Sequence, residues 1–523
     1  MASNGKSRPG DAAVAGLADR TTGLVGWTIA WRATSAVATL ALGAFLIRQL
    51  PASEYGRYTF VLSVLVYIAL LATFGQDQGL LRYLPEVLGR GDRAGARDLL
   101  RKSAIAVFAV WALTSATVFV FRPLIDRLLQ AHVADLLALG TVLLLGGIAT
   151  GVLSFALVAI YDMRSQAIAT PIAGALTLAL AVFFLRGGGG GLNGVLVAGA
   201  IGQSVLALVY FWILMRRINR ASGIPGDRIG WRRLLVYASG WLPSLLIASA
   251  VGLQFENIFL LRFAGSTAVA YYDTGYNIPQ RLVSLIPSLL TGAWVVGTLE
   301  GWRRESDRIR ASVAAFYKGI FLVAFPLAFA GGALLGPLIR LYTNGRYPPS
   351  ERIAPLMLLF FIAALLATPW GLVVRVRELA WLNALITIAQ LGFAAVADLW
   401  LIQRYGLGGA VVAVGLTTAL TLVLTFVAWR AFDRRTLNIP WRYAGRCMLA
   451  ASPYLFLLPF AFTRLPVRPL VVVAVAASAL TTVAWGYLVR QLGLLSEREV
   501  PLLHQSRHGP VKLALRYLAP SDK

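Results

Sequence analysis

The feature that most limits the fold is a series of long apolar runs, because a membrane-spanning helix needs roughly 20 mostly apolar residues. We identify fourteen such runs in the 523 residues, and the longest connection between them is about 25 residues (79–102). Only 14% of the residues are charged, whereas soluble domains have about 25%. We therefore predict an all-α polytopic membrane protein without an inserted soluble domain. The predicted spans are 25–48, 58–78, 103–121, 134–161, 166–185, 193–215, 234–262, 267–298, 313–339, 353–374, 379–402, 406–429, 447–463 and 469–489.

The distribution of basic residues predicts the orientation of these spans. With the N-terminus in the cytoplasm, cytoplasmic segments carry 33 of the 48 Lys and Arg residues and the opposite side carries 12. Cytoplasmic connections of membrane proteins are enriched in Lys and Arg, so this bias favours fourteen spans with both termini in the cytoplasm. We expect 1–24 and 490–523 to be cytoplasmic tails, and 1–24 shows no signal-peptide pattern.

The composition also excludes several classes of function. A net charge of +25 would suit nucleic acid, but the basic residues lie in short segments between apolar runs, so we expect no nucleic-acid partner. One Cys and three His leave little for a metal centre. The sequence contains no G-x-x-x-x-G-K-[ST] motif and no recognisable nucleophile–base–acid set. We predict that the chain has no cofactor and is not an enzyme. A membrane glycosyltransferase or polymerase is the alternative from a different class, and an assay of sugar transfer would test it.

Two segments of the chain resemble each other. FLIRQLPASEYGRY (45–58) and FLLRFAGSTAVAYY (259–272) share Phe-Leu-aliphatic-Arg and a Tyr ten residues after the Arg, at a constant offset of 214. Six helices return the chain to the same side of the membrane, so this match predicts two parallel repeats around a central site. The predicted parts are an N-terminal lobe (25–215), a cytoplasmic linker (216–233), a C-terminal lobe (234–429) and two further helices (447–489).

The stretch PASEYGRYTFVLSVLVYIALLATFGQDQGLLRYLPEVLGRGD resembles the first helix pair of the polysaccharide-biosynthesis flippases. These belong to the multidrug/oligosaccharidyl-lipid/polysaccharide (MOP) exporter superfamily. The resemblance rests on Tyr55-Gly56, Tyr58-Thr59, Gly75 and the run LRYLPE (81–86). Further along the chain, Glu256 before an apolar stretch and the elements Tyr276-Asn277 and Arg281 also fit the family.

The resemblance implies the activity and the partners. A flippase of this kind would move a polyprenyl-diphosphate-linked oligosaccharide from the cytoplasmic to the outer leaflet for exopolysaccharide or O-antigen assembly. It would alternate between inward-open and outward-open states, among membrane lipids and beside the polysaccharide polymerase machinery. Two alternatives from the same superfamily remain open. One is a flippase for the peptidoglycan lipid precursor, and the other is a cation-coupled multidrug exporter.

Three cations lie inside predicted spans, where ionisable groups are costly and usually face a cavity or the bundle interior. Arg32, Arg281 and Lys318 all fall in the inner half of the membrane by helical rise. A guanidinium pairs bidentately with phosphate oxygens, so we predict a site for the diphosphate. Tyr276 and Asn277 complete the predicted substrate-binding set. Each cation also has a structural explanation that does not involve substrate. Lys318 would extend its side chain to the membrane interface, Arg32 would pair with Asp77, and Arg281 would belong to an irregular part of its helix.

Acidic residues form a second predicted set. Glu256 and Asp273 fall in the outer third of adjacent spans and, with Asp77, are candidates for binding a proton or sodium ion that drives transport. Glu256 and Asp273 are alternatively salt-bridge partners of Arg262. Asp398 lies near an outer helix end, and we expect it to be merely interfacial.

Overall fold

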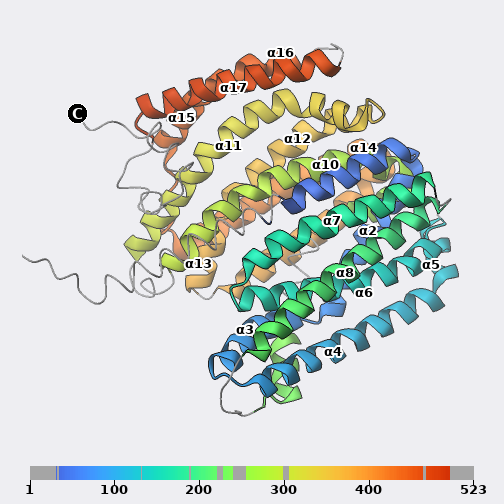
Figure 1. Ribbon diagram of the computed structural model, residues 1–523. Helices are drawn as coiled ribbons and strands as arrows, with labels where there is room; N and C mark the ends of the chain where they lie inside the picture. The colour runs from blue at the N-terminus through green and yellow to red at the C-terminus, as the bar shows by residue number, and fades with distance from the viewer. Residues whose placement is uncertain are drawn as a thin grey trace, which may run out of the picture. The chain divides into compact units, whose positions relative to one another are not determined.

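Every regular element in the described residues is an α-helix or a 3-10 helix, as the apolar runs predict. The computed structural model describes residues 31, 34–130, 132–187, 190–220, 228–239, 255–298, 306–377, 379–462 and 467–494. The chain is therefore an all-α polytopic membrane protein (Figure 1). The helices are Thr34–Gln49, α2 (Ala52–Thr73), α3 (Gln76–Gly89), α4 (Arg93–Val120), α5 (Arg122–Leu129), α6 (Ala134–Ala159), α7 (Met163–Arg186), α8 (Gly191–Asn219), 231–239, α10 (Glu256–Thr298), α11 (Ser306–Thr343), α12 (Pro348–Ala364), η1 (Leu365–Ala367), α13 (Trp370–Arg377), α14 (Ala380–Asp433), α15 (Trp441–Ala450), η2 (Ser452–Leu457), α16 (Leu458–Phe462) and α17 (Val467–Gln491).

Nine helices of the described chain are long and apolar enough to cross a membrane. One of them, Trp381–Asp433, has 53 residues, enough for two spans. It is sharply kinked at Gly406, between the predicted spans 379–402 and 406–429. The predicted total of fourteen stays a prediction, because 25–30 and 240–254 lie outside the described residues.

Two helix breaks repeat at the offset of the sequence match. The first separates Thr34–Gln49 from α2 at Leu50-Pro51, and the second lies at Gly265 within α10. Pro51 and Gly265 are 214 residues apart, which is the offset of the two similar segments. Gly265 has φ +82° and ψ 170°, a backbone conformation that glycine adopts readily. The two similar segments therefore share a helix–break–helix pattern.

A third break was missed by hydropathy. The predicted span 58–78 is interrupted at Phe74 and Gly75, whose φ values of +46° and +68° place both in the left-handed region. α2 ends there, and α3 continues through the start of the segment predicted as a loop (79–102). Hydropathy averages over a window, so it does not detect a two-residue change of backbone direction.

The chain divides into two compact units. The N-terminal unit comprises the described parts of Trp27–Asp273 and Thr387–Ala413. The C-terminal unit comprises the described parts of Thr274–Ile386 and Val414–Lys523. These units group helices by contact, whereas the predicted lobes follow the internal repeat, so the lobe boundaries stay a prediction.

In the N-terminal unit, α6 is the central helix. It packs against α2, α3, α4 and α8, and Figure 1 shows α6 running alongside α8. Small residues allow the close approach: a Cβ at Gly140 would lie 2.7 Å from Leu65, and one at Gly146 would lie 2.9 Å from Ser204. Such contacts drive helix association in lipid, where burial of apolar surface gives no advantage.

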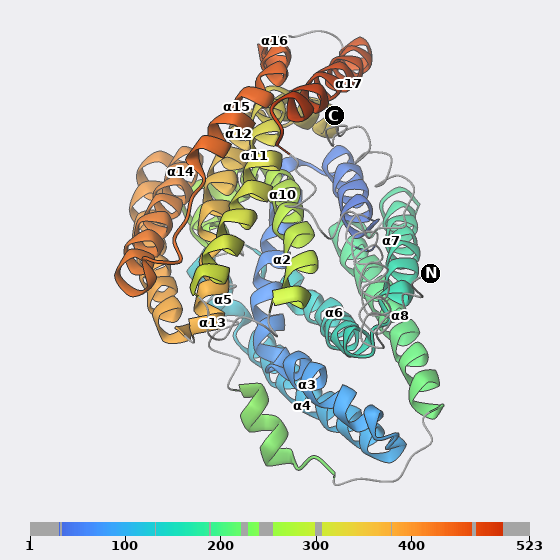
Figure 2. The ribbon, with the colours of Figure 1, turned by 90° about the vertical axis from the view of Figure 1, so that its left-hand side faces the viewer.

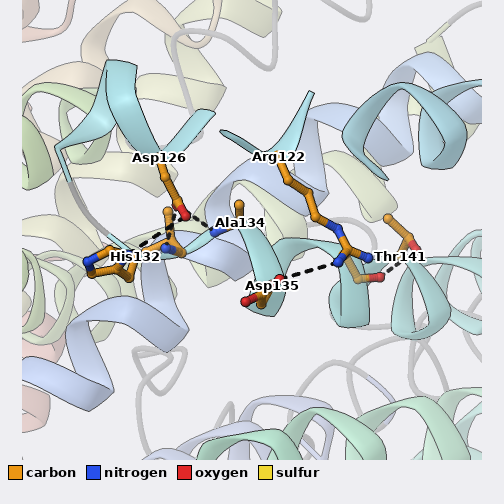
Figure 3. Close-up of polar contacts among 8 residues, drawn as sticks. Arg122, Asp126, His132, Ala134, Asp135 and Thr141 are labelled. Atoms are coloured by element: carbon orange, nitrogen blue, oxygen red, sulfur yellow. Dashed lines mark hydrogen bonds and ion pairs between the residues drawn. The ribbon is translucent and has the colours of Figure 1, made fainter. Parts of the chain in front are cut away.

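The N-terminus of α6 is capped by an acidic side chain. Asp126 on α5 accepts hydrogen bonds from the backbone N–H groups of Val133 and Ala134, both at 2.9 Å (Figure 3). These N–H groups have no acceptor within the helix, so the carboxylate supplies the hydrogen-bond acceptor that they would otherwise lack. Nearby, Arg122 pairs with Asp135 at 3.3 Å.

In the C-terminal unit, α11 packs against α12, α15, α16 and α17, and Figure 2 shows α15 beside α11 and α17. Its core is aromatic. The rings of Trp370 and Trp429 are 5.7 Å apart, and Tyr317 stacks on Trp429 at 6.4 Å. Two of the three polar groups are paired: the Tyr317 hydroxyl donates to the Leu366 carbonyl oxygen, and Trp429 Nε1 donates to Thr436. Trp370 Nε1 is buried without a hydrogen-bond partner among the described residues.

Candidate transport site

One face of α2 is polar although the helix has the length of a membrane span. Tyr55, Thr59, Ser63 and Tyr67 recur at every fourth position and therefore lie along the same side of the helix. This is the side on which α2 meets α10. A Cβ added at Gly56 would lie 1.7 Å from the carbonyl oxygen of Ser266, so only glycine permits this approach.

The crossing of α2 and α10 joins equivalent positions of the two repeats. The Cβ position of Gly56 lies 3.2 Å from the backbone nitrogen of Ala270, and these two residues are 214 apart, as in the sequence match. In a molecule with twofold pseudo-symmetry, a residue that contacts its own equivalent lies beside the axis. The predicted pseudo-twofold axis between the repeats would therefore run close to the polar face of α2.

Polar contacts connect this face to α10 on both sides of its break at Gly265. The Tyr55 hydroxyl donates to Oδ2 of Asp273 at 3.3 Å. The side-chain amide of Asn257 donates to Oγ of Ser63 at 2.9 Å. Both Asp273 and Asn257 are buried, at 6% and 0% exposure. Buried polar groups in a membrane protein are costly unless paired, so this network fixes the register of the two helices.

Two carboxyl groups near this network lie within electrostatic range of each other. Glu256 begins α10, and Asp398 belongs to the part of α14 that lies in the N-terminal unit. Glu256 is close enough to interact electrostatically with Asp398, and Tyr67 interacts with both. Oε2 of Glu256 and both carboxyl oxygens of Asp398 are buried without a hydrogen-bond partner among the described residues.

This pairing corrects the expectation for Asp398. We expected an interfacial residue, but its side chain is only 1% exposed. No local sequence pattern predicts this proximity, because α10 and α14 are far apart along the chain. Two ionised carboxylates would repel each other in a place that excludes water, and a shared proton or a small cation removes that repulsion.

The other predicted ion-coupling residues have different surroundings. Asp77 lies in the first turn of α3, after the break, and not on the polar face of α2. It is 8% exposed, and its Oδ2 accepts a hydrogen bond from the Gln78 amide at 2.9 Å. Arg262, the suggested partner of Glu256 and Asp273, donates to the backbone carbonyl oxygen of Leu128 at the end of α5.

The predicted substrate-binding residues belong to the C-terminal unit, except Arg32, which lies outside the described residues. Arg281 is half-buried on α10 and makes no ion pair within the described chain. Asn277 is half-buried one turn earlier, and Tyr276 is buried with its ring 4.8 Å from that of Phe361. Tyr276 is thus a packing residue in this conformation.

Lys318 is half-buried on α11, and its ammonium group lies 5.4 Å from the centre of the Tyr443 ring. A cation over an aromatic face is stabilised by about 0.5–2 kcal/mol, depending on how far it is desolvated. This contact gives Lys318 a structural role in holding α15 against α11.

The arrangement of helices is that of the MOP superfamily transporters. An inward-facing multidrug resistance transporter of the MATE family matches with a TM-score of 0.60 at 18% identity, over 76% of this chain and 96% of that chain. The lipid II flippase MurJ in an inward closed conformation matches with a TM-score of 0.67 at 10% identity, over 89% and 98%. A MOP superfamily transporter from Pyrococcus furiosus, described with a binding pocket of reversed polarity, matches with a TM-score of 0.52 at 16% identity, over 79% and 96%.

The family follows from the sequence. Residues 25–295, just over half of the chain, match the model of the polysaccharide biosynthesis protein family, and the protein belongs to that family. No curated protein matches the chain significantly. The protein is thus a multi-pass membrane protein of polysaccharide biosynthesis with a transporter fold, as the LRYLPE motif and its neighbours predict.

Proposed function

We propose that this protein is a flippase that moves a polyprenyl-diphosphate-linked oligosaccharide across the bacterial inner membrane during surface polysaccharide assembly. The observation that carries the proposal is the combination of a polysaccharide biosynthesis family with a transporter fold. The solved structures that share this fold include a flippase for a lipid-linked precursor. The direction is from the cytoplasmic to the outer leaflet, with both termini in the cytoplasm, and the positive-inside bias of 33 to 12 supports this orientation.

Arg281 is the residue that we assign to the substrate diphosphate, together with Arg32 and Lys318. A half-buried guanidinium that has no acidic partner in the described chain is expensive in a membrane, which supports a role in binding an anion. Its planar fork matches two phosphate oxygens at once. Asn277, one turn away, supplies a further donor for the same headgroup.

Glu256 and Asp398 are the residues that we assign to ion coupling. A transporter that works against a gradient needs a second ligand whose binding differs between its two states. Protonation or sodium binding at this carboxyl pair changes its net charge, and the charge biases the packing of α10 and α14 beside α2. Asp273, held by Tyr55, extends the same network.

Replacement of Arg281 tests the substrate site. We expect Arg281→Ala to reduce polymer export by at least about 10-fold, because loss of one charge-assisted hydrogen bond costs about 1.5–3 kcal/mol. The measurement is surface polysaccharide in cells that lack the chromosomal copy, with membrane levels of the protein checked by immunoblotting. Arg430→Ala, which removes an exposed arginine at the end of α14, is the matched control.

Normal export by Arg281→Ala would reject the assigned role. The related functions give different results in the same strains. A peptidoglycan precursor flippase would make deletion lethal, and a multidrug exporter would confer dye efflux without any polysaccharide defect. A glycosyltransferase or polymerase would transfer sugar as the purified protein alone.

A further inference from the structure

A pocket in the N-terminal unit lies apart from the proposed transport residues. It has a volume of about 460 Å³ and lies where α3, α6 and α8 end, on the face that the basic segments predict to be cytoplasmic. Most of its lining is apolar, and two arginines stand at its rim. The lining residues are Pro85, Leu88, Gly89, Ala159, Ile160, Tyr161, Arg217 and Arg220.

The rim carries an excess of positive charge. Arg217 lies 3.7 Å from Oδ2 of Asp162, but Oδ1 of Asp162 already caps α7 by accepting the backbone N–H of Ser165. The Arg217 side chain keeps 58% of its surface exposed. Arg220 is exposed and makes no ion pair with any residue that the structure describes. The rim therefore carries two accessible guanidinium groups, and only Arg217 has an acidic partner in the described chain.

The segments around the pocket add to its positive charge. In the described parts of 76–102, 160–165, 216–220 and 228–239, no aspartate or glutamate is exposed, because each of these acids caps a helix or pairs with a neighbouring side chain. Twelve arginines of the same segments are exposed. They are Arg82, Arg90, Arg93, Arg97, Arg101, Arg164, Arg216, Arg217, Arg220, Arg228, Arg232 and Arg233.

Part of this charge has a simpler explanation. Cations near helix C-termini complement the helix dipole, and Arg217 and Arg220 lie at the end of α8. That effect favours arginines near these ends but does not account for an open pocket between them.

Neighbouring residues place the pocket at the boundary between lipid and water. Trp212 is 53% exposed, and the guanidinium of Arg216 lies 3.4 Å from the centre of its ring. Tyr161 is 72% exposed and is held in the left-handed region at φ +59° by the tight turn between α6 and α7. Exposed Trp and Tyr gather at the headgroup level of membranes, next to apolar surface that faces the acyl chains. Leu208 and Phe211 continue that apolar surface along α8, at 67% and 48% exposure.

We propose that this pocket binds the headgroup of an anionic phospholipid of the adjacent leaflet, with its phosphate between Arg217 and Arg220. The apolar floor receives the glycerol and the first acyl carbons, and Tyr161 covers the open side. Basic pockets between spanning helices recognise anionic lipids in this way. The ligand is a lipid of the surrounding bilayer and not the transported glycan, since none of Arg281, Lys318 and Asn277 lines the pocket.

Lipid binding to the purified full-length protein tests the proposal. Native mass spectrometry measures the fraction of protein that carries phosphatidylglycerol or phosphatidylcholine, each added at the same concentration. We expect the wild type to prefer phosphatidylglycerol. The double substitution Arg217→Gln/Arg220→Gln should weaken that binding by about 10-fold or more, since each arginine near an anionic lipid contributes about 5-fold.

Two further variants keep the result interpretable. Arg101→Gln/Arg232→Gln removes the same charge from exposed positions of the same face outside the pocket, and it should retain phosphatidylglycerol. Arg217→Lys/Arg220→Lys preserves charge and folding, and it should retain part of the preference. If the glutamine pair outside the pocket weakens binding as much as the pair inside it, the site is a diffuse surface and the proposal is wrong.

The source of the phosphate is tested separately. If polyprenyl diphosphate displaces phosphatidylglycerol from the wild type and binds more tightly, the pocket belongs to the substrate path, and the phospholipid assignment is overturned. Binding is measured without transport, so failure of the proposed flippase function would leave this result unaffected.

Discussion

At the scale of single residues, the most informative group is the buried carboxyl pair. Glu256 was identified from the sequence because an acid in an apolar segment is expensive. Asp398 satisfied the same criterion but was assigned to an interface from its position near a helix end. Its exposure of 1% shows that its environment is set by the helices around it and not by its depth in its own helix.

We predict that Asp398→Asn uncouples transport from the ion gradient. The amide cannot be protonated and carries no charge, so the pair loses one of its two titratable groups. In proteoliposomes, gradient-driven movement of a lipid-linked glycan should fall by about 10-fold or more, while equilibration without a gradient continues.

The matched control is Asp135→Asn. Asp135 is 92% exposed and pairs with Arg122 beyond the end of α4 (Figure 3). An exposed pair of this kind contributes at most about 1 kcal/mol, so this variant should transport normally. Gradient-dependent transport by Asp398→Asn at the wild-type rate would remove the carboxyl pair from the coupling mechanism.

At the scale of helices, glycine determines where elements meet and where they break. Gly265 and Gly406 interrupt α10 and α14 at points that hydropathy predicts as span ends. Gly56 has a different role, because it lies inside a continuous helix and lets the backbone of α10 approach. The sequence repeat pointed to this region, but only the contact between Gly56 and Ala270 shows that equivalent positions face each other.

Gly56→Ala is expected to destabilise the protein by about 1–3 kcal/mol, because the added methyl group would overlap the backbone of α10 and force the helices apart. Gly147→Ala is the control, since no atom lies within 4 Å of a Cβ at that position in α6. Thermal unfolding in detergent measures both. The control should be neutral or slightly stabilising, because alanine favours a helix more than glycine does. Equal stability of the two variants would contradict the tight crossing of α2 and α10.

At the scale of the whole molecule, the testable feature is the orientation of the spans. His132, in the turn between α5 and α6, is predicted to lie on the outer side, and its side chain is 95% exposed. Arg228, in the predicted linker 216–233, is exposed and should face the cytoplasm. The single native Cys447 is buried, so labelling reports the introduced residues.

We predict that a membrane-impermeant maleimide labels His132→Cys in intact cells with a permeable outer membrane. Arg228→Cys should be labelled only after the inner membrane is opened. The reverse pattern would place the termini outside. It would also move the phospholipid pocket at the ends of α3, α6 and α8 to the opposite leaflet.

The sequence by itself determined the all-α membrane class, the approximate position of most spans and the family, because bilayer thickness and the cost of burying charge act on each segment separately. It also marked the repeat that reappears as the two breaks at Pro51 and Gly265. Tertiary structure alone decided that Asp398 joins Glu256, that Gly56 meets Ala270, and that the ends of three helices enclose a pocket with two arginines. Each of these depends on contacts between helices distant in the chain, and such contacts are set by the packing of side chains that no local pattern records.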